Sequence, residues 1–115
     1  MKGLVVQPLV YVLKGLVVQP LVYVLKLDDD KINVGITYNF NLRYAQHECG
    51  EGAKWTRKHK PIAIIEVVPN ASTEVENTKT IEYMKLYGLE NVRGGYWCKL
   101  DMKNPPKMLD QKCQG

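Results

Sequence analysis

The 115-residue sequence predicts an α/β fold of the α+β kind, with a small antiparallel three-stranded sheet flanked by helices. Three observations support this fold class. Two runs rich in β-forming residues, 22–27 and 31–36, flank an Asp-Asp-Asp break, which is the pattern of a β-hairpin. A third, nearly continuous apolar run follows at 62–67. Two longer segments, 39–49 and 71–87, carry the start and stop signals of helices.

The loop of the hairpin decides which side chains share a face of the sheet. A three-residue loop at 28–30 places Tyr23 and Asn33 on one face, whereas a two-residue turn at 29–30 places them on opposite faces. The residues of the hairpin leave both registers open.

The first helix is expected to begin near Asn39, whose side chain can cap it, and to end before Gly50. Its inner face is predicted to consist of Leu42, Ala45 and Cys49. These positions follow the spacing that places side chains on one side of a helix.

The remaining elements follow from composition. Residues 50–59 form a glycine-containing basic loop, and the apolar run at 62–67 is typical of a central strand covered on both faces. The second helix runs from about 71 to 87 and is closed by Gly88. Residues 92–98 hold a short strand or an ordered loop.

The N-terminal part is a perfect tandem duplication, because residues 2–13 recur identically at 14–25. Two copies are too few for a solenoid. The second copy alone places its tyrosine, Tyr23, within hairpin distance of the next strand. The first copy is an inert duplication, an added edge strand, or a swap element that pairs with another molecule, and an artefact of gene construction would give the same pattern. We favour an ordered strand in a dimer contact.

The expected organisation is a duplicated extra strand segment at 1–13, a main domain at 14–100 and a C-terminal tail at 101–115. The length allows one modest core. The net charge of +4 is a mild basic excess that permits nucleic-acid binding without requiring it. The basic residues concentrate between Arg43 and Lys60. This stretch contains five Lys and Arg residues and two histidines but only two glutamates.

The three cysteines are an odd number without framework spacing, so reduced thiols and an intracellular location, cytoplasmic or nuclear, are expected. The absence of a CxxC pair argues against zinc. Polar residues and prolines interrupt the apolar N-terminus before it reaches the ~20 residues of a membrane helix, and no small-residue cleavage site follows it. No membrane partner is expected.

Several separated motifs occur in an order that resembles the GIY-YIG nucleases, over roughly residues 20–98. They are the strand tyrosine Tyr23, the strand segment Val34-Gly35-Ile36-Thr37, the helix pair Arg43 and His47, the basic segment from Gly50 to Arg57, Lys60-Pro61 before the third strand, Glu76 and Tyr83-Met84 on the second helix, and Val92-Arg93-Gly94-Gly95. The resemblance is specific because it rests on several motifs in order. It also implies the three-residue hairpin loop, since the family has both tyrosine positions in the active site. The chain departs from the family by carrying Asn33 at the second tyrosine position.

The resemblance implies a metal-dependent DNA endonuclease that uses Mg²⁺ or Mn²⁺. Such hydrolysis needs an attacking water, groups that stabilise charge in the transition state, and usually a metal ion. The catalytic residues carried over are Tyr23, Arg43 and His47, with Asn33 at the family's tyrosine position, and Glu76 is the metal ligand. The implied DNA-binding residues are Lys54, Trp55, Arg57, Lys58 and Arg93.

Each assignment has an ordinary alternative. Glu76 also fits a capping box that begins at Thr73, Arg43 fits a solvated helix position, and Trp55 fits a core position in a solvated loop. The alternative function is a catalytically inactive DNA-binding or self-associating module on the same fold, because the amide of Asn33 cannot act as a base. The expected partners are DNA and a second copy of the chain, in a homodimer or higher assembly through residues 2–13. Replacing Asn33 by tyrosine is expected to raise cleavage without loss of folding.

Overall fold

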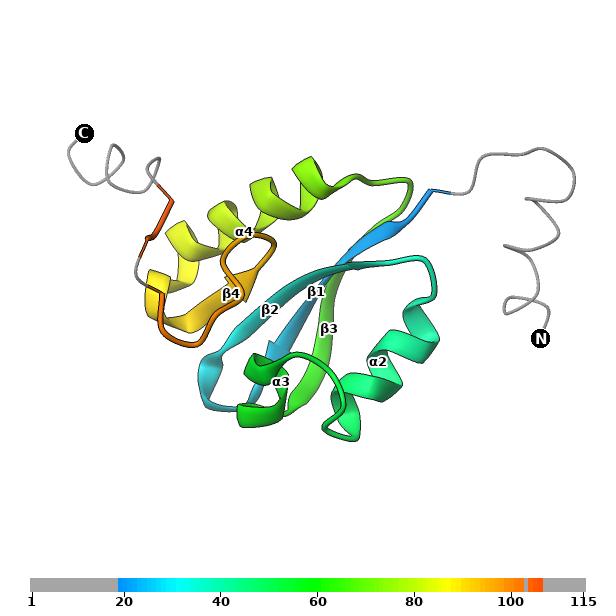
Figure 1. Cartoon of the computed structure of the whole chain (residues 1–115), viewed down its shortest axis with the longest axis horizontal. Coiled ribbons are helices and arrows are strands. Elements are labelled where there is room, and N and C mark those ends of the chain that lie inside the picture. The colour runs from blue at the N-terminus through cyan, green and yellow to red at the C-terminus, as the bar shows by residue number, and fades with distance from the viewer. Residues whose placement is uncertain (1–18, 103, 107–115) are drawn as a thin grey trace, which may run out of the picture.

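A four-stranded mixed sheet forms the centre of the computed structural model, which describes residues 19–102 and 104–106 (Figure 1). Its strands are β1 (Leu21–Leu27), β2 (Ile32–Thr37), β3 (Pro61–Val68) and β4 (Val92–Gly94), in the order β3-β1-β2-β4. β1 pairs antiparallel with both β2 and β3, and β4 pairs parallel with β2. The expected three antiparallel strands are therefore joined by a fourth, parallel strand. The first copy of the duplication lies outside the described residues.

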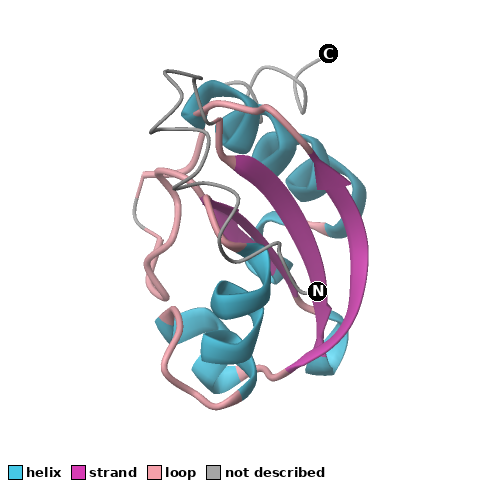
Figure 2. Ribbon diagram, turned by 90° about the vertical axis from the view of Figure 1, so that its right-hand side faces the viewer, coloured by secondary structure: helices cyan, strands magenta, loops and turns pink. Residues whose placement is uncertain are grey.

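Helices cover both faces of this sheet (Figures 1 and 2). They are α2 (Phe40–Glu48), α3 (Lys54–Lys58) and α4 (Thr73–Tyr87), with single 3-10 turns at Asp28–Asp30 (η1) and Leu89–Asn91 (η2). α2 and α3 lie on one face and α4 lies on the other (Figure 1). No helix in the described part of the chain is both long and apolar enough to span a bilayer.

The hairpin has the three-residue loop. The Leu27 amide donates to the Lys31 carbonyl across the loop at 2.8 Å, and two of the loop aspartates adopt positive φ angles of 63° and 59°, which aspartate tolerates better than most residues. Leu25 is paired with Asn33, so Tyr23, two residues before Leu25, lies on the same face as Asn33. The predicted register is confirmed.

β1 is the buried centre of the fold, and its alternate side chains build two cores. The core on the α4 face consists of Val22, Val24, Ile32, Val34, Ala71, Tyr83, Met84 and Val92. The core on the α2 and α3 face consists of Tyr23, Leu25, Leu27 and Trp55, with Leu21, Phe40 and Tyr44 packed against it. Tyr23 therefore belongs to a face that is covered by helices and is not a surface residue of the strand.

The prediction that the third strand is central and covered on both faces was wrong. β3 lies at one edge of the sheet and, among the described strands, pairs with β1 alone. Ile62, Ile64, Ile65 and Val67 remain between 40% and 56% exposed. The helices pack over the middle of the sheet, so an apolar run at the edge stays open to solvent.

One polar cluster ties this edge strand to α4. Tyr83 donates through its hydroxyl to Glu66 at 2.8 Å, and the Lys79 ammonium contacts the other oxygen of the same carboxylate at 2.8 Å. Burial and the bonded carboxylate raise the pKa of Tyr83 to about 12. This cluster holds β3 against α4 through Glu66, and its bonds do not involve the backbone at the outer edge of β3.

The predicted cap of the first helix is confirmed, but its predicted inner face was wrong. Asn39 accepts a hydrogen bond from the Leu42 amide at 3.1 Å. The Leu42 side chain is 56% exposed, and Ala45 and Cys49 are exposed as well. The helix instead turns Phe40, Tyr44 and His47 toward the sheet. The following segment, expected to be a loop, contains the short helix α3.

Candidate functional site

Three buried polar side chains form a continuous hydrogen-bonded chain between β1, α2 and α3. The Tyr23 hydroxyl lies 2.7 Å from His47 Nε2, and His47 Nδ1 lies 2.7 Å from Thr56 Oγ1. Thr56 Oγ1 in turn donates to the Ala53 carbonyl at 2.9 Å. Because a hydroxyl has one hydrogen, Thr56 must accept from Nδ1–H. The imidazole therefore carries its proton on Nδ1, and Nε2 accepts from Tyr23.

Burial keeps both partners of this bond neutral. His47 and Tyr23 are each 1% exposed. Burial, with a smaller contribution from the Arg43 charge, lowers the pKa of His47 to about 4. For Tyr23, in contrast, burial raises the pKa. The neighbouring Arg43 opposes that rise, and the charge of Glu76 adds to it. Near neutral pH the pair is therefore a neutral phenol that donates to a neutral imidazole.

Two glycines make room for these side chains. A Cβ on Gly35 would lie 2.3 Å from the Tyr23 Cζ and hydroxyl oxygen atoms, and a Cβ on Gly52 would lie 2.3 Å from His47 Nδ1. No side chain fits at such distances, so glycine at both positions lets the phenol and the imidazole meet. Gly35 belongs to the motif Val-Gly-Ile-Thr, whose spatial role the sequence alone does not show.

Arg43 lies on α2, one turn before His47 and beside the Tyr23 hydroxyl. Its charge acts on the pKa of both residues. Within the described residues, its guanidinium makes one side-chain hydrogen bond, to Gln46 Oε1 at 3.1 Å. A guanidinium has five N–H donors, so this half-buried group retains donors for an anion.

Glu76 reaches the same region from α4. Its Oε2 accepts a hydrogen bond from the Gly95 amide at 3.2 Å. The helix is capped by Ser72, whose hydroxyl accepts from the Val75 amide. The capping box proposed for Thr73 and Glu76 is therefore wrong. Burial raises the pKa of Glu76, and the Gly95 amide partly offsets the rise.

The structure thus places His47, Arg43 and Asn33 beside Tyr23, and Glu76 near enough for its charge to act on the phenol. Asn33 is 5% exposed, and its amide lowers the pKa of Tyr23. The charges of Arg43 and Glu76 both act on that same phenol. Residues of the hairpin and of α2 therefore surround one hydroxyl group, and the carboxylate of Glu76 on α4 acts on it through its charge.

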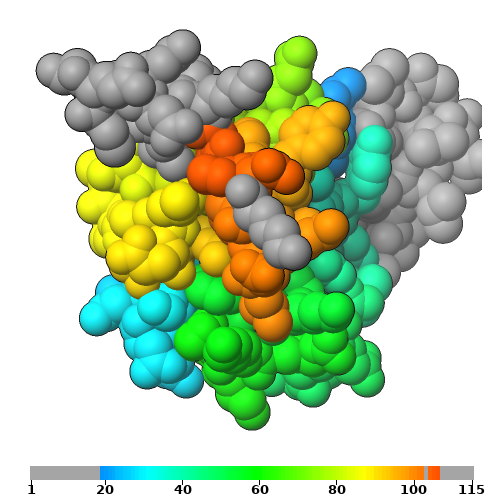
Figure 3. All heavy atoms as spheres, turned by 60° about the vertical axis from the view of Figure 1, so that its left-hand side comes forward, coloured from blue at the N-terminus to red at the C-terminus, as the bar shows by residue number. Residues whose placement is uncertain are grey.

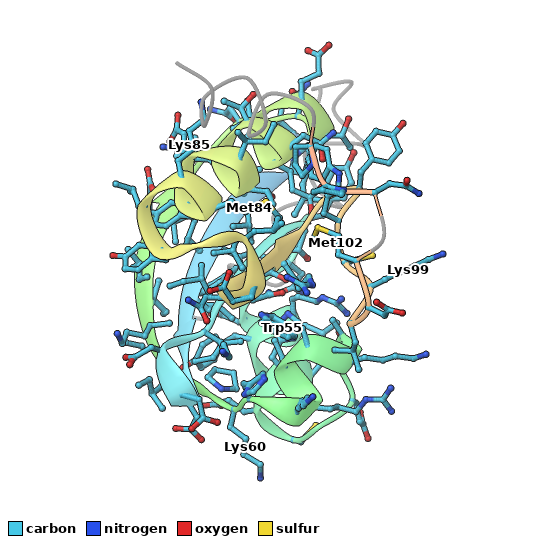
Figure 4. The ribbon with its side chains drawn as sticks, turned by 90° about the vertical axis from the view of Figure 1, so that its left-hand side faces the viewer. Trp55, Lys60, Met84, Lys85, Lys99 and Met102 are labelled. Carbon is cyan, nitrogen blue, oxygen red and sulfur yellow. The ribbon has the colours of Figure 1, made fainter. Side chains whose placement is uncertain are left out.

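The predicted DNA-binding residues divide into two groups. Lys54, Arg57 and Lys58 are exposed on α3, where they can meet a phosphate backbone. Trp55 is 4% exposed and donates from its indole to the Ile32 carbonyl at 2.8 Å, and Arg93 is 6% exposed. Trp55 lies in the interior of the molecule, whereas Lys60 and Lys99 point away from it (Figure 4).

Arg93 serves the structure around Trp55. Its guanidinium donates to the carbonyls of Leu89, Lys99 and Leu100 at 2.7–3.0 Å and lies 4.8 Å from the centre of the Trp55 ring. A side chain with these partners is not presented to DNA in this conformation. The alternative that Trp55 is a core residue agrees with the structure.

A pocket of about 820 Å³ lies between α3 and the segment that follows β4. Its lining is mixed aromatic and polar and consists of Ala53, Lys54, Tyr96, Trp97, Cys98, Lys99, Leu100, Asp101, Met102 and Asn104. In Figure 3 the orange segment of these later residues lies against the green residues of α3. Two of the lining residues connect the pocket to the site. The Ala53 carbonyl accepts a hydrogen bond from Thr56, and Tyr96 follows Gly95, whose amide donates to Glu76.

The donor set around Tyr23 fits magnesium better than zinc. In the part of the chain that the structure describes, no three His, Cys, Asp or Glu side chains lie close enough to hold a metal ion together. Magnesium is bound by one or two carboxylates and keeps waters and phosphate oxygens as its other ligands. Glu76 can supply the single carboxylate, whereas zinc would need three or four protein ligands.

Comparisons with known proteins give short matches. No family model matches the chain. A UPF0213 protein of Cupriavidus pinatubonensis is 47% identical over 34 residues, which are 30% of this chain and 38% of the relative. UPF0213 proteins of Natronomonas pharaonis and Staphylococcus haemolyticus are 43% and 36% identical over 37 and 40 residues, or 32% and 35% of this chain and 44% and 49% of the relatives. The chain thus spans less than half the length of these relatives, and no solved structure matches it.

Proposed function

We propose that this protein is a metal-dependent endonuclease that hydrolyses phosphodiester bonds in DNA. The observation that supports this function best is the 2.7 Å hydrogen bond from the Tyr23 hydroxyl to the unprotonated Nε2 of His47. It gives a buried phenol a base for its proton, next to a cationic Arg43 and a carboxylate at Glu76. A base, a cation and a carboxylate around one hydroxyl match the needs of phosphodiester hydrolysis.

In this proposal Tyr23 relays a proton from water to His47. The water oxygen forms a bond to phosphorus while its proton moves to the Tyr23 oxygen and the phenol proton moves to His47 Nε2. The phosphorus–oxygen bond to the leaving nucleotide breaks, and the departing oxygen keeps the electron pair and takes a proton from solvent. Thr56 holds the imidazole in the tautomer that this relay needs.

In this proposal the two proton movements occur together. Burial raises the pKa of Tyr23 and lowers that of His47 to about 4, so the phenol holds its proton more tightly than the imidazole does. Moving the phenol proton to the imidazole alone is therefore uphill in the resting protein. A concerted transfer leaves Tyr23 neutral throughout and avoids a buried phenolate.

The other residues stabilise charge on the phosphate. Arg43 can donate two parallel N–H groups to phosphate oxygens, which a point charge such as lysine cannot do. A divalent cation held by Glu76 would neutralise phosphate charge and lower the pKa of a bound water. The exposed Lys54, Arg57 and Lys58 on α3 would contact the DNA backbone.

One observation favours the second candidate, a catalytically inactive DNA-binding module. The family's second tyrosine position is filled by Asn33, which is buried on the same face as Tyr23. Its amide can position a water molecule but cannot accept a proton. The active proposal therefore expects slow cleavage, and the inactive alternative expects binding without cleavage.

The test is a nicking assay on supercoiled plasmid and on a branched duplex, with Mg²⁺ or with EDTA. The proposal expects Mg²⁺-dependent nicking that Glu76→Gln abolishes, because glutamine can still accept from the Gly95 amide but provides no carboxylate. The matched control is Glu74→Gln on the exposed side of the same helix, which should cut at the unchanged rate. Nicking that persists in EDTA, or equal rates for the Glu76 and Glu74 variants, would refute the metal role.

Binding measured by fluorescence anisotropy separates the two candidate functions. A folded chain that binds the branched duplex and cuts neither substrate would establish the inactive module. A chain that neither binds nor cuts DNA would refute both candidates.

A further inference from the structure

Among the strands in residues 19–102 and 104–106, none pairs with the outer edge of β3, and this strand is apolar. β3 is eight residues long, and its described pairing partner is β1, on one side. Ile62, Ile64, Ile65 and Val67 are 56%, 49%, 40% and 42% exposed. The far side of the strand presents backbone N–H and C=O groups, with irregularities where the register against β1 shifts. Such an edge is a template for another strand.

The chain itself contains a second copy of the strand that β3 already binds. Residues 9–13 and 21–25 have the same sequence, Leu-Val-Tyr-Val-Leu. In the structure the later copy is part of β1 and pairs antiparallel with β3, where Tyr23 is opposite Val67 and Leu25 is opposite Ile64. We propose that the outer edge of β3 accepts the first copy, residues 9–13, from a second molecule of this protein.

The first copy suits the edge of β3 in its side chains as well as in its backbone. The β-branched and aromatic residues of the first copy have the composition that favours cross-strand pairs with isoleucine and valine. Pro8 precedes the first copy as Pro20 precedes β1. A proline at that point does not interrupt the ladder, because it lies before the paired residues.

The length of the connection indicates that the strand comes from a second molecule. A strand antiparallel to β3 on its outer side runs parallel to β1. Parallel strands in one sheet need a connection of a dozen or more residues, but only the seven residues 14–20 separate the two copies. A second molecule has no such limit. Reciprocal donation would give a closed dimer with two identical contacts.

The experiment measures mass in solution by light scattering with the full chain. The proposal expects twice the chain mass of 13.1 kDa for the wild type and the single-chain mass for Val10→Pro. Proline removes a backbone donor from the first copy and leaves β1 intact. The matched control is Val10→Thr, which keeps a β-branched residue and should remain a dimer.

The acceptor edge is tested separately. Ile64→Lys places a charge on β3 and should halve the mass, whereas Leu86→Lys, at a 73% exposed position of α4, should leave a dimer. A circular-dichroism melt of each variant verifies folding. A monomeric wild-type chain would overturn the proposal, and so would a dimer that survives Ile64→Lys. If Val10→Thr dissociates like Val10→Pro, strand pairing through the first copy is also refuted.

Discussion

Acidification should destabilise this protein through His47 in particular. The imidazole is 1% exposed, and its pKa is lowered from the ordinary 6.5 to about 4. Between these two values the unfolded chain binds a proton that the folded chain excludes. The stability that depends on a neutral His47 is therefore fully present above pH 6.5 and is lost as the pH falls toward 4.

The size of the effect follows from the two pKa values. At pH 5 an unfolded histidine with a pKa near 6.5 is almost fully protonated, while His47 with a pKa of about 4 is largely neutral. The corresponding loss in the free energy of unfolding is about 2 kcal/mol between pH 7 and pH 5, and about 3 kcal/mol by pH 4. A loss of this size is a large part of the stability of a small domain.

The measurement is urea unfolding at pH 7 and pH 5, followed by tryptophan fluorescence, for the wild type and for His47→Gln. Glutamine keeps a polar side chain at the position but cannot titrate. The wild type should lose about 2 kcal/mol more than the variant over this interval, because every other titratable group is present in both proteins. Equal pH dependence in the two proteins would show that His47 is not held neutral by burial.

Substitutions at three further positions probe the same site. Thr56→Val should cost about 1–3 kcal/mol in urea unfolding because it leaves the buried Nδ1–H of His47 without an acceptor, and Thr56→Ser should restore most of it. Gly35→Ala should lower the nicking rate more than tenfold, because its Cβ displaces the Tyr23 ring; an unchanged rate in a folded variant would contradict the proton relay. Asn33→Tyr should still raise the nicking rate, but the position is 5% exposed, so the ring should cost about 1–3 kcal/mol of stability, against the earlier expectation of no loss. A folded tyrosine variant that cuts no faster would show that the missing hydroxyl does not limit cleavage.

The elements with local signals could be predicted from the sequence. The Asp triplet fixed the position of the hairpin loop, Asn39 capped α2, and Gly88 closed α4 at the expected residue. Caps and turns depend on residues within a few positions of each other. Such features are therefore visible without knowledge of the fold.

The position of a strand within the sheet could not be predicted in the same way. The apolar run of β3 has the composition of a buried central strand, yet its neighbours are decided by residues far away in the chain. The same limit applies to Glu76, whose side chain fits a local cap but bonds to Gly95. Local pattern shows what a residue can bind, and topology decides which partner it meets.

The inner face of α2 illustrates a second limit. Apolar spacing favoured Leu42, but the helix buries His47 because two hydrogen bonds satisfy its ring. Burying a polar group is affordable when its partners are present. Thr56, the partner of His47 Nδ1, lies on the separate helix α3. The only signal for it in the sequence was that a buried histidine needs hydrogen-bond partners.

From the parallel pairing of β4 with β2 we expect the two parts of the candidate site to have different lifetimes. Ile32 pairs with Val92, sixty residues later, through a ladder of three residue pairs, whereas the hairpin closes between Lys26 and Ile32. Long-range pairings form late in folding, and short ladders open first in native fluctuations. A brief departure of β4 would separate Gly95 from Glu76 while the phenol–imidazole pair stays intact. The hydrogen-exchange rate of β4 amides would then report how often the protein loses the support of its carboxylate without unfolding.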